Sequence, residues 1–218
     1  MEKTITVKGT GRISVQPDLT IVSLTLKSID TDYEKAMQNA EEKLLALQSA
    51  LNDIGFAKKD LKTADFSVKT EHKSVRNRFG DYESVFNGYS CVQRLKLEFD
   101  FDTKMLSKVL SAIATCISEP QLNIEFSVKD KTAVNDALLE SAAINAKKKA
   151  EILAKASGVT LGELIRIDYN WSEIDIYSGT GCEMEDGLVH CFSKSMEVDI
   201  TPEDLEVSDS ATFVWAIK

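Results

Sequence analysis

The stretch LTIVSLTLKSIDTDYEKAMQNAEEKLLALQSALNDIGF, residues 19–56, decides the fold class because its apolar residues change period within it. Over Val22–Lys27 apolar and polar residues alternate, as in a strand with one buried face. Over Tyr33–Leu51 the apolar residues recur about every 3.6 positions, and Gly55 ends that pattern. We therefore predict a half-buried strand followed by a long amphipathic helix that begins near Asp32.

The same two periods continue to residue 128. A second helix, capped by Asp102 or Thr103 and followed by Pro120, is predicted from its apolar stripe. Alternation predicts three more strands, over Lys62–Thr70, Tyr89–Phe99 and Ile124–Val128. The order strand, helix, strand, strand, helix, strand is that of a ferredoxin-like βαββαβ unit.

Two segments that contain turn-forming residues are predicted to be irregular. The polar stretch Glu71–Ser84 includes Asn77 and Gly80 and predicts an exposed loop. Gly9-Thr10-Gly11 separates the strand-like segments Thr4–Lys8 and Arg12–Gln16, which indicates a hairpin or a strand bend.

Beyond residue 128 the pattern predicts one more long helix and several strands. The helix, Thr132–Ser157, has an alanine-rich face that lets a neighbouring element approach closely, and Gly158 caps it. Strands are expected at Ile165–Trp171, Met196–Ile200 and Leu205–Ile217. The fold class is α+β, with a mostly antiparallel sheet covered on one face by long helices. It forms either a single domain over residues 1–218 or two closely packed α/β halves.

Particular side chains are expected in the core of this fold. Cys91 and Cys116 fall in strand and helix patterns and fit small core positions. The apolar stripes of the helices should be buried, including the one leucine from each that is given below, and the aromatic residues on strand faces should be in the core or in subunit contacts. These residues are Leu44, Leu110 and Leu153, and Trp171, Phe213 and Trp215.

Charge and hydropathy limit the partners. The net charge of −9 repels nucleic acids and anionic membranes, and the basic run Lys147–Lys149 lies in a helical pattern whose charged side chains face water. No apolar run reaches the roughly 18 residues of a membrane span. Because the N-terminus begins directly with a strand pattern, we expect a cytoplasmic protein without a signal peptide. If a leader has been removed, the periplasm or cell envelope is expected instead.

The residues that could bind a metal lie in the irregular segment 172–193. Cys182, His190 and Cys191 supply ligand atoms of the kind that zinc prefers, although their spacing matches no common zinc motif. A Cys182–Cys191 disulfide and simple solvation of the loop are the alternatives. The segment could also hold a small molecule.

No catalytic or cofactor-binding constellation is recognisable. Gly9-Thr10-Gly11 and Gly179-Thr180-Gly181 are not followed by a helix as a phosphate loop requires. Neither His72 nor His190 lies near a nucleophile motif. We therefore expect no cofactor and no enzymatic activity, with a hydrolase that works through carboxylates as the alternative.

Several ordered segments together resemble the SIMPL-domain family, a bacterial family of largely unknown function that includes periplasmic immunogenic proteins. They include residues 5–11, 15–18, 51–56, 60–63, 87–89, 126–128, 156–162 and 205–208. The resemblance implies an α+β domain, oligomers that in some relatives form rings or channels, and roles in stress tolerance and signalling; it implies no catalytic residues. We accordingly predict a self-associating, non-enzymatic scaffold, a homo-oligomer linked to stress response.

Overall fold

The computed structural model describes residues 3–76, 78–79, 81–116, 120–170, 176–178, 182–184 and 200–218. The chain divides into two compact units. Unit 1 comprises residues 1–18, 127–179 and 202–218, and unit 2 comprises residues 19–126 and 180–201. Each unit has its own β-sheet, so the prediction of one shared sheet is wrong. The first and the last long strand of the chain pair with each other and not with the sheet of unit 2. The period of the apolar residues alone does not reveal this pairing.

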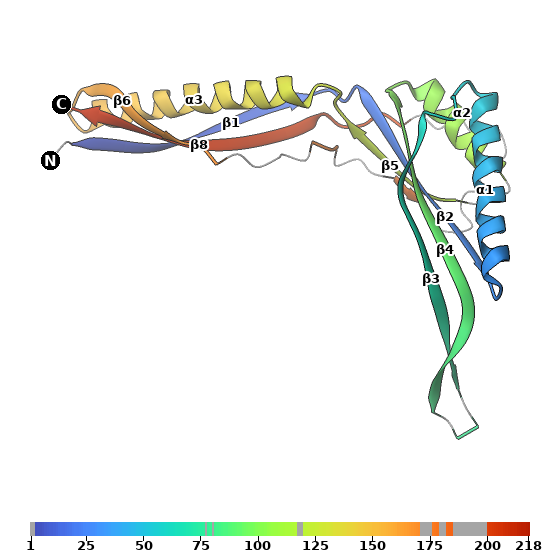
Figure 1. Ribbon diagram of the computed structural model, residues 1–218. Coiled ribbons are helices and arrows are strands. Elements are labelled where there is room, and N and C mark those ends of the chain that lie inside the picture. Colours follow the sequence, from blue (N-terminus) through green and yellow to red (C-terminus); the bar gives the residue numbers. More distant parts are fainter. Residues whose placement is uncertain are drawn as a thin grey trace. The chain divides into compact units, whose positions relative to one another are not determined.

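Unit 2 contains the predicted ferredoxin-like arrangement (Figure 1). Its elements are β2 (Leu19–Asp30), α1 (Tyr33–Asp53), β3 (Leu61–Arg76), β4 (Tyr82–Asp100), α2 (Thr103–Ala114), β5 (Gln121–Ser127) and β7 (Cys182–Met184). The strands lie in the order β3-β4-β2-β5-β7, and the first four form the βαββαβ sheet. The α+β class and this unit are therefore confirmed.

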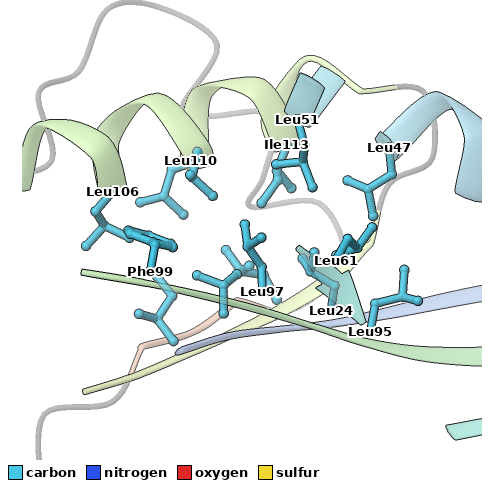
Figure 2. Close-up of a cluster of buried hydrophobic side chains, with 14 of the residues drawn as sticks. Leu24, Leu47, Leu51, Leu61, Leu95, Leu97, Phe99, Leu106, Leu110 and Ile113 are labelled. Atoms are coloured by element: carbon cyan, nitrogen blue, oxygen red, sulfur yellow. The ribbon is translucent and has the colours of Figure 1, made fainter. Parts of the chain in front are cut away.

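Aspartate side chains cap the first turns of the two helices of unit 2, and apolar stripes orient the helices on the sheet. Asp32 caps α1 by accepting hydrogen bonds from the backbone N–H groups of Glu34 and Lys35, and Asp102 caps α2 through Lys104. Their apolar stripes cover one face of the sheet, and Figure 2 shows the leucines of both helices meeting those of β2 and β4. Cys91 is fully buried on β4, as predicted.

The predicted loop at 71–84 is wrong, because most of it forms the far part of a hairpin between β3 and β4. The strand β2 ends at Asp30, which pairs with Tyr89, so the hairpin continues beyond this point as two strands only. We call this part the arm: Glu71–Arg76 of β3 and Tyr82–Gly88 of β4. Figure 1 shows it extending past the N-terminal end of α1. Val75, Tyr82 and Val85 alternate with polar residues, and this weak period-two signal favours strands.

Unit 1 consists of a three-stranded sheet and one helix. Its elements are β1 (Thr4–Val15), α3 (Lys131–Ala156), β6 (Leu161–Asp168) and β8 (Leu205–Ile217), with the strand order β1-β8-β6. The predicted turn at Gly9-Thr10-Gly11 is wrong, because β1 runs through it and pairs with β8 along its whole length. The glycines serve a close approach instead: a Cβ on Gly9 would lie 2.1 Å from the carbonyl oxygen of Ala142 on α3.

The face that α3 turns to the sheet differs in part from the expected one. Alanines at 142, 146, 150 and 154 are buried, as their small size predicts, whereas Leu153 is 47% exposed. The buried stripe follows the alanines, because β1 lies too close for larger side chains. Lys147–Lys149 face solvent and Phe213 and Trp215 are buried, as predicted. The rings of Phe213 and Trp215 also stack on each other. Trp171 and residues 196–199 lie outside the described residues.

Candidate functional site

The predicted metal ligands are only partly within the described residues. Cys182 lies in β7, where its backbone pairs with Ile124 of β5. Its side chain is not described, and His190 and Cys191 lie outside the described residues. Over the ranges that are described, no three His, Cys, Asp or Glu side chains gather as metal ligands do. The metal, small-molecule and disulfide hypotheses for this segment therefore stay predictions.

The first candidate site is the arm, on which exposed apolar side chains lie close together. Val75, Tyr82, Val85 and Phe86 are all more than 40% exposed. The register places Lys73 opposite Val85 and Arg76 opposite Tyr82, so Val75 and Val85 share one face of the hairpin while Tyr82 and Phe86 share the other. A two-stranded hairpin has no core of its own, so apolar side chains on both faces indicate that another surface covers them.

The edge of β3 adds unpaired backbone groups to this surface. Within the described sheet, β3 is an edge strand and hydrogen-bonds only to β4. Edge strands with free N–H and C=O groups readily add a strand from another chain. The charged residues of β3 are four cations and two carboxylates, although the whole chain has a net charge of −9. They are Lys62, Lys69, Lys73 and Arg76, and Asp65 and Glu71.

A second candidate site is a groove between α1 and β4. It has a volume of about 480 Å³ and is bounded by the first half of α1 and by Gln93. Gln93 is 7% exposed, and its Oε1 has no hydrogen-bond partner among the described residues. The other residues that line the groove are Tyr33, Glu34, Met37, Gln38, Glu41 and Leu44. A buried acceptor without a donor is costly, so it needs a physical explanation.

Sequence reasoning did not single out Gln93, although a signal exists. Gln93 stands in the inward row of β4 between Cys91 and Leu95, both of them buried. A polar residue at a period-two core position is unusual, because burying an amide without a partner opposes folding. The groove above it is formed by a helix that folds back on the sheet, and alternation alone gives no sign of it.

We predict that Gln93→Leu stabilises the protein. Leucine has a similar volume and suits neighbours such as Leu26, which pairs with Gln93 across β2 and β4. Removing the unpaired amide oxygen should raise the free energy of unfolding by about 1–2 kcal/mol. Urea unfolding followed by circular dichroism measures this change. Gln38→Leu, at an exposed position on the groove rim, is the control and should change stability by less than about 0.5 kcal/mol; a loss of stability in Gln93→Leu would show that the amide is satisfied in the folded protein.

The buried thiol of Cys91 has the properties of a core group. Burial raises the pKa of Cys91, and its hydrogen bond with Ser28 opposes this shift only in part. A thiol with a raised pKa forms little thiolate near neutral pH and is a poor nucleophile. Cys91 therefore belongs to the core and not to a reactive site.

One family model and several known proteins match the sequence of this chain. The family model for SIMPL, described as a protein of unknown function (DUF541), matches residues 5–215. The 26 kDa periplasmic immunogenic protein of Brucella melitensis is 24% identical over 163 residues, which are 75% of this chain and 65% of that protein. The uncharacterized protein YggE of Escherichia coli K12 is 23% identical over 168 residues, 77% of this chain and 66% of that protein.

These relatives are longer than the part that this chain matches. The chain spans 65% of the length of the Brucella proteins. The described helices contain no stretch long and apolar enough to cross a membrane. The sequence resemblance to this family is confirmed by the family match.

Proposed function

Because this chain belongs to the SIMPL family, whose function is unknown, we propose that it works as a non-enzymatic scaffold that self-associates through the arm. The observation that carries the proposal is the exposed apolar hairpin with side chains on both faces and a free strand edge. Such a hairpin lowers its free energy when a second surface removes it from water.

The partner that we propose for the arm is a second copy of this chain. The basic edge strand β3 contrasts with the acidic character of the molecule as a whole, so β3 of one copy is attracted to the surface of another. Exposed carboxylates such as Glu34, Glu41 and Glu42 of α1 contribute to that acidic surface. Charge complementarity of this kind selects partners and orients them.

The compartment and the cellular role are part of the same proposal. The Brucella relatives are named periplasmic, which favours the periplasm over the cytoplasm for this chain, and no relative supports the cytoplasmic expectation. A role in stress response, implied by the family resemblance, would depend on the assembly. A variant that cannot assemble is then expected to lose it.

Two substitutions on one face of the arm should convert the assembly to monomers. In Val75→Lys with Val85→Glu, each new charge lies opposite an existing opposite charge, Glu83 and Lys73, so the hairpin itself is retained. The apolar contact is lost, and sedimentation velocity and light scattering should show a molar mass near the 24.1 kDa of one chain.

The control removes two exposed apolar side chains from another surface with the same new charges. Ile144→Lys with Ile152→Glu does this on α3, where both residues are more than half exposed. The control should keep the molar mass of the native assembly. A native protein that is monomeric at all accessible concentrations, or an arm variant that still assembles, would refute the proposal.

A further inference from the structure

The two edges of the sheet in unit 1 differ in how their backbone groups are occupied. On the β1 edge, Oδ1 of Asn145 on α3 accepts a hydrogen bond from the N–H of Thr10 at 3.1 Å. Nζ of Lys149 donates to the carbonyl oxygen of Lys8 at 3.1 Å. A helix that occupies these groups protects a strand edge from other chains. The opposite edge is β6, whose backbone pairs only with β8 among the described residues, so its outer groups are available to a further strand.

The side chains of β6 add an apolar surface to this free edge. Leu164, Ile165 and Ile167 are 47, 48 and 52% exposed. The helix α3 packs on β1 and β8 and hardly reaches β6, so it leaves these aliphatic groups uncovered. An edge strand with several exposed aliphatic side chains favours contact with a further chain.

Two shifts in register limit how much of the β6 edge can pair regularly. They lie between Leu161 and Leu164 and between Leu164 and Arg166, whereas the pairing with β8 is regular from Arg166 to Asp168. Irregularities of this kind bend a strand and interrupt its ladder. A further strand can therefore continue a regular ladder only from Arg166 onward.

The charges of this regular part are complementary to a second copy of the same strand. Arg166 and Asp168 lie on one face of the sheet and form an ion pair at 3.0 Å. In an antiparallel pair of identical strands, a two-fold axis perpendicular to the sheet places residues of the same face opposite each other. An axis at Arg166 or at Asp168 would bring like charges together, which opposes pairing. An axis at Ile167 places each Arg166 opposite Asp168 of the other copy.

We propose that β6 pairs antiparallel with β6 of a second copy of this chain, about a two-fold axis at Ile167. The two Ile167 side chains then cover each other on one face of the joined sheets, while the charges of Arg166 and Asp168 pair on the other face. Because the regular edge is short, we expect a dissociation constant on the order of millimolar. The contact lies in unit 1 and does not rest on the arm, which belongs to unit 2.

Replacing Ile167 by cysteine tests the pairing through a disulfide between copies. Residues directly opposite in an antiparallel pair have Cα atoms about 4.5–5.5 Å apart, a distance that a disulfide spans. At about 1 mM protein under mild oxidation, Ile167→Cys should form a covalent dimer at least about tenfold faster than Leu164→Cys. Leu164 is similarly exposed on the same strand but lies away from the axis. The native chain gives the background from its own cysteines, and peptide mass spectrometry locates the bond.

Charge variants of the Ile167→Cys chain test the register. Asp168→Lys places cations opposite each other and should slow the crosslink by about tenfold. Adding Arg166→Glu restores opposite charges in reversed order and should restore most of the rate. Absence of this recovery would overturn the proposal. Equal rates for Ile167→Cys and Leu164→Cys would also overturn it and would leave the edge to an extended segment of another protein.

The arm variant Val75→Lys with Val85→Glu separates this contact from the assembly proposal. With Ile167→Cys added, the arm variant should be monomeric at micromolar concentration and should still form the crosslink at about 1 mM. Loss of the crosslink while the native assembly is intact would refute the β6 contact alone. An arm variant that still assembles at micromolar concentration would refute the arm contact alone.

Discussion

Replacing Gly11 by alanine is expected to lower the free energy of unfolding by roughly 3 kcal/mol, the upper range for overpacking a tight contact. A Cβ at this position would lie 2.1 Å from the carbonyl oxygen of Leu138 and 3.0 Å from the backbone nitrogen of Ala142. Both atoms belong to the backbone of α3, so no side-chain rotation relieves the clash. The helix would have to move away from β1.

Hydrogen bonds between α3 and β1 oppose such a movement. The backbone N–H of Thr10 donates to Oδ1 of Asn145 at 3.1 Å, and that of Arg12 donates to Oγ of Ser141 at 3.4 Å. Moving the helix outward would break these bonds and open space beside the buried alanines. The strain therefore cannot be dispersed at low cost.

Urea unfolding and hydrogen exchange of the β1 and β8 amides measure the effect of Gly11→Ala. Thr10→Ala is the matched control, since it lies on the same strand and its side chain points to the opposite face. It should cost less than about 1 kcal/mol. Equal stabilities for the two variants would mean that α3 does not lie against the backbone of β1 in solution.

The sequence predicts the ferredoxin-like unit well, because burial on one face forces the two periods to be clear. Each apolar pattern buries its residues in only one kind of secondary structure, and the other kind would expose half of them. The buried row of the strand is Leu95, Leu97 and Phe99, and the buried stripe of the helix is Leu106, Leu110 and Ile113. Strand order follows from the usual connectivity of such elements. The pairing of β1 with β8 has no local signal, because nearly two hundred residues separate the two strands.

The error at Gly9-Thr10-Gly11 arises because glycine has two uses. It permits a turn, and it also permits a helix to pack directly on a strand. The complementary signal is the alanine-rich face of the long helix, which predicts the close approach of a neighbour. That neighbour is the glycine-containing strand, and only the tertiary structure joins the two observations.

The candidate sites were harder to predict than the fold. The sequence of the arm is as polar as that of a loop. Its strands continue the backbone pairing of β3 with β4 from the part of the hairpin that lies in the sheet of unit 2. Gln93 becomes notable only when α1 is seen to leave its Oε1 without a donor. The proposed ligands Cys182, His190 and Cys191 depended on residue type alone, and no described contact supports or opposes them.

Replacing Phe126 by alanine should lower the free energy of unfolding by about 3–5 kcal/mol. Phe126 is fully buried at the end of β5, and its ring packs edge-on against Phe101 with the centroids 5.6 Å apart. The substitution removes a large apolar group and leaves a cavity among residues of β2, β4 and α2 that cannot collapse freely. The aromatic contact is lost as well.

Two variants establish whether this loss comes from the cavity. Phe126→Leu keeps most of the volume and should recover more than half of the stability, as measured by urea and thermal unfolding. Phe66→Ala removes the same ring from a side chain that is 47% exposed on β3, and should cost about 1 kcal/mol or less. If Phe126→Ala were no more destabilising than Phe66→Ala, β5 would not be packed under the helices, and the sheet that carries both the arm and the groove would lack the support that the structure assigns to it.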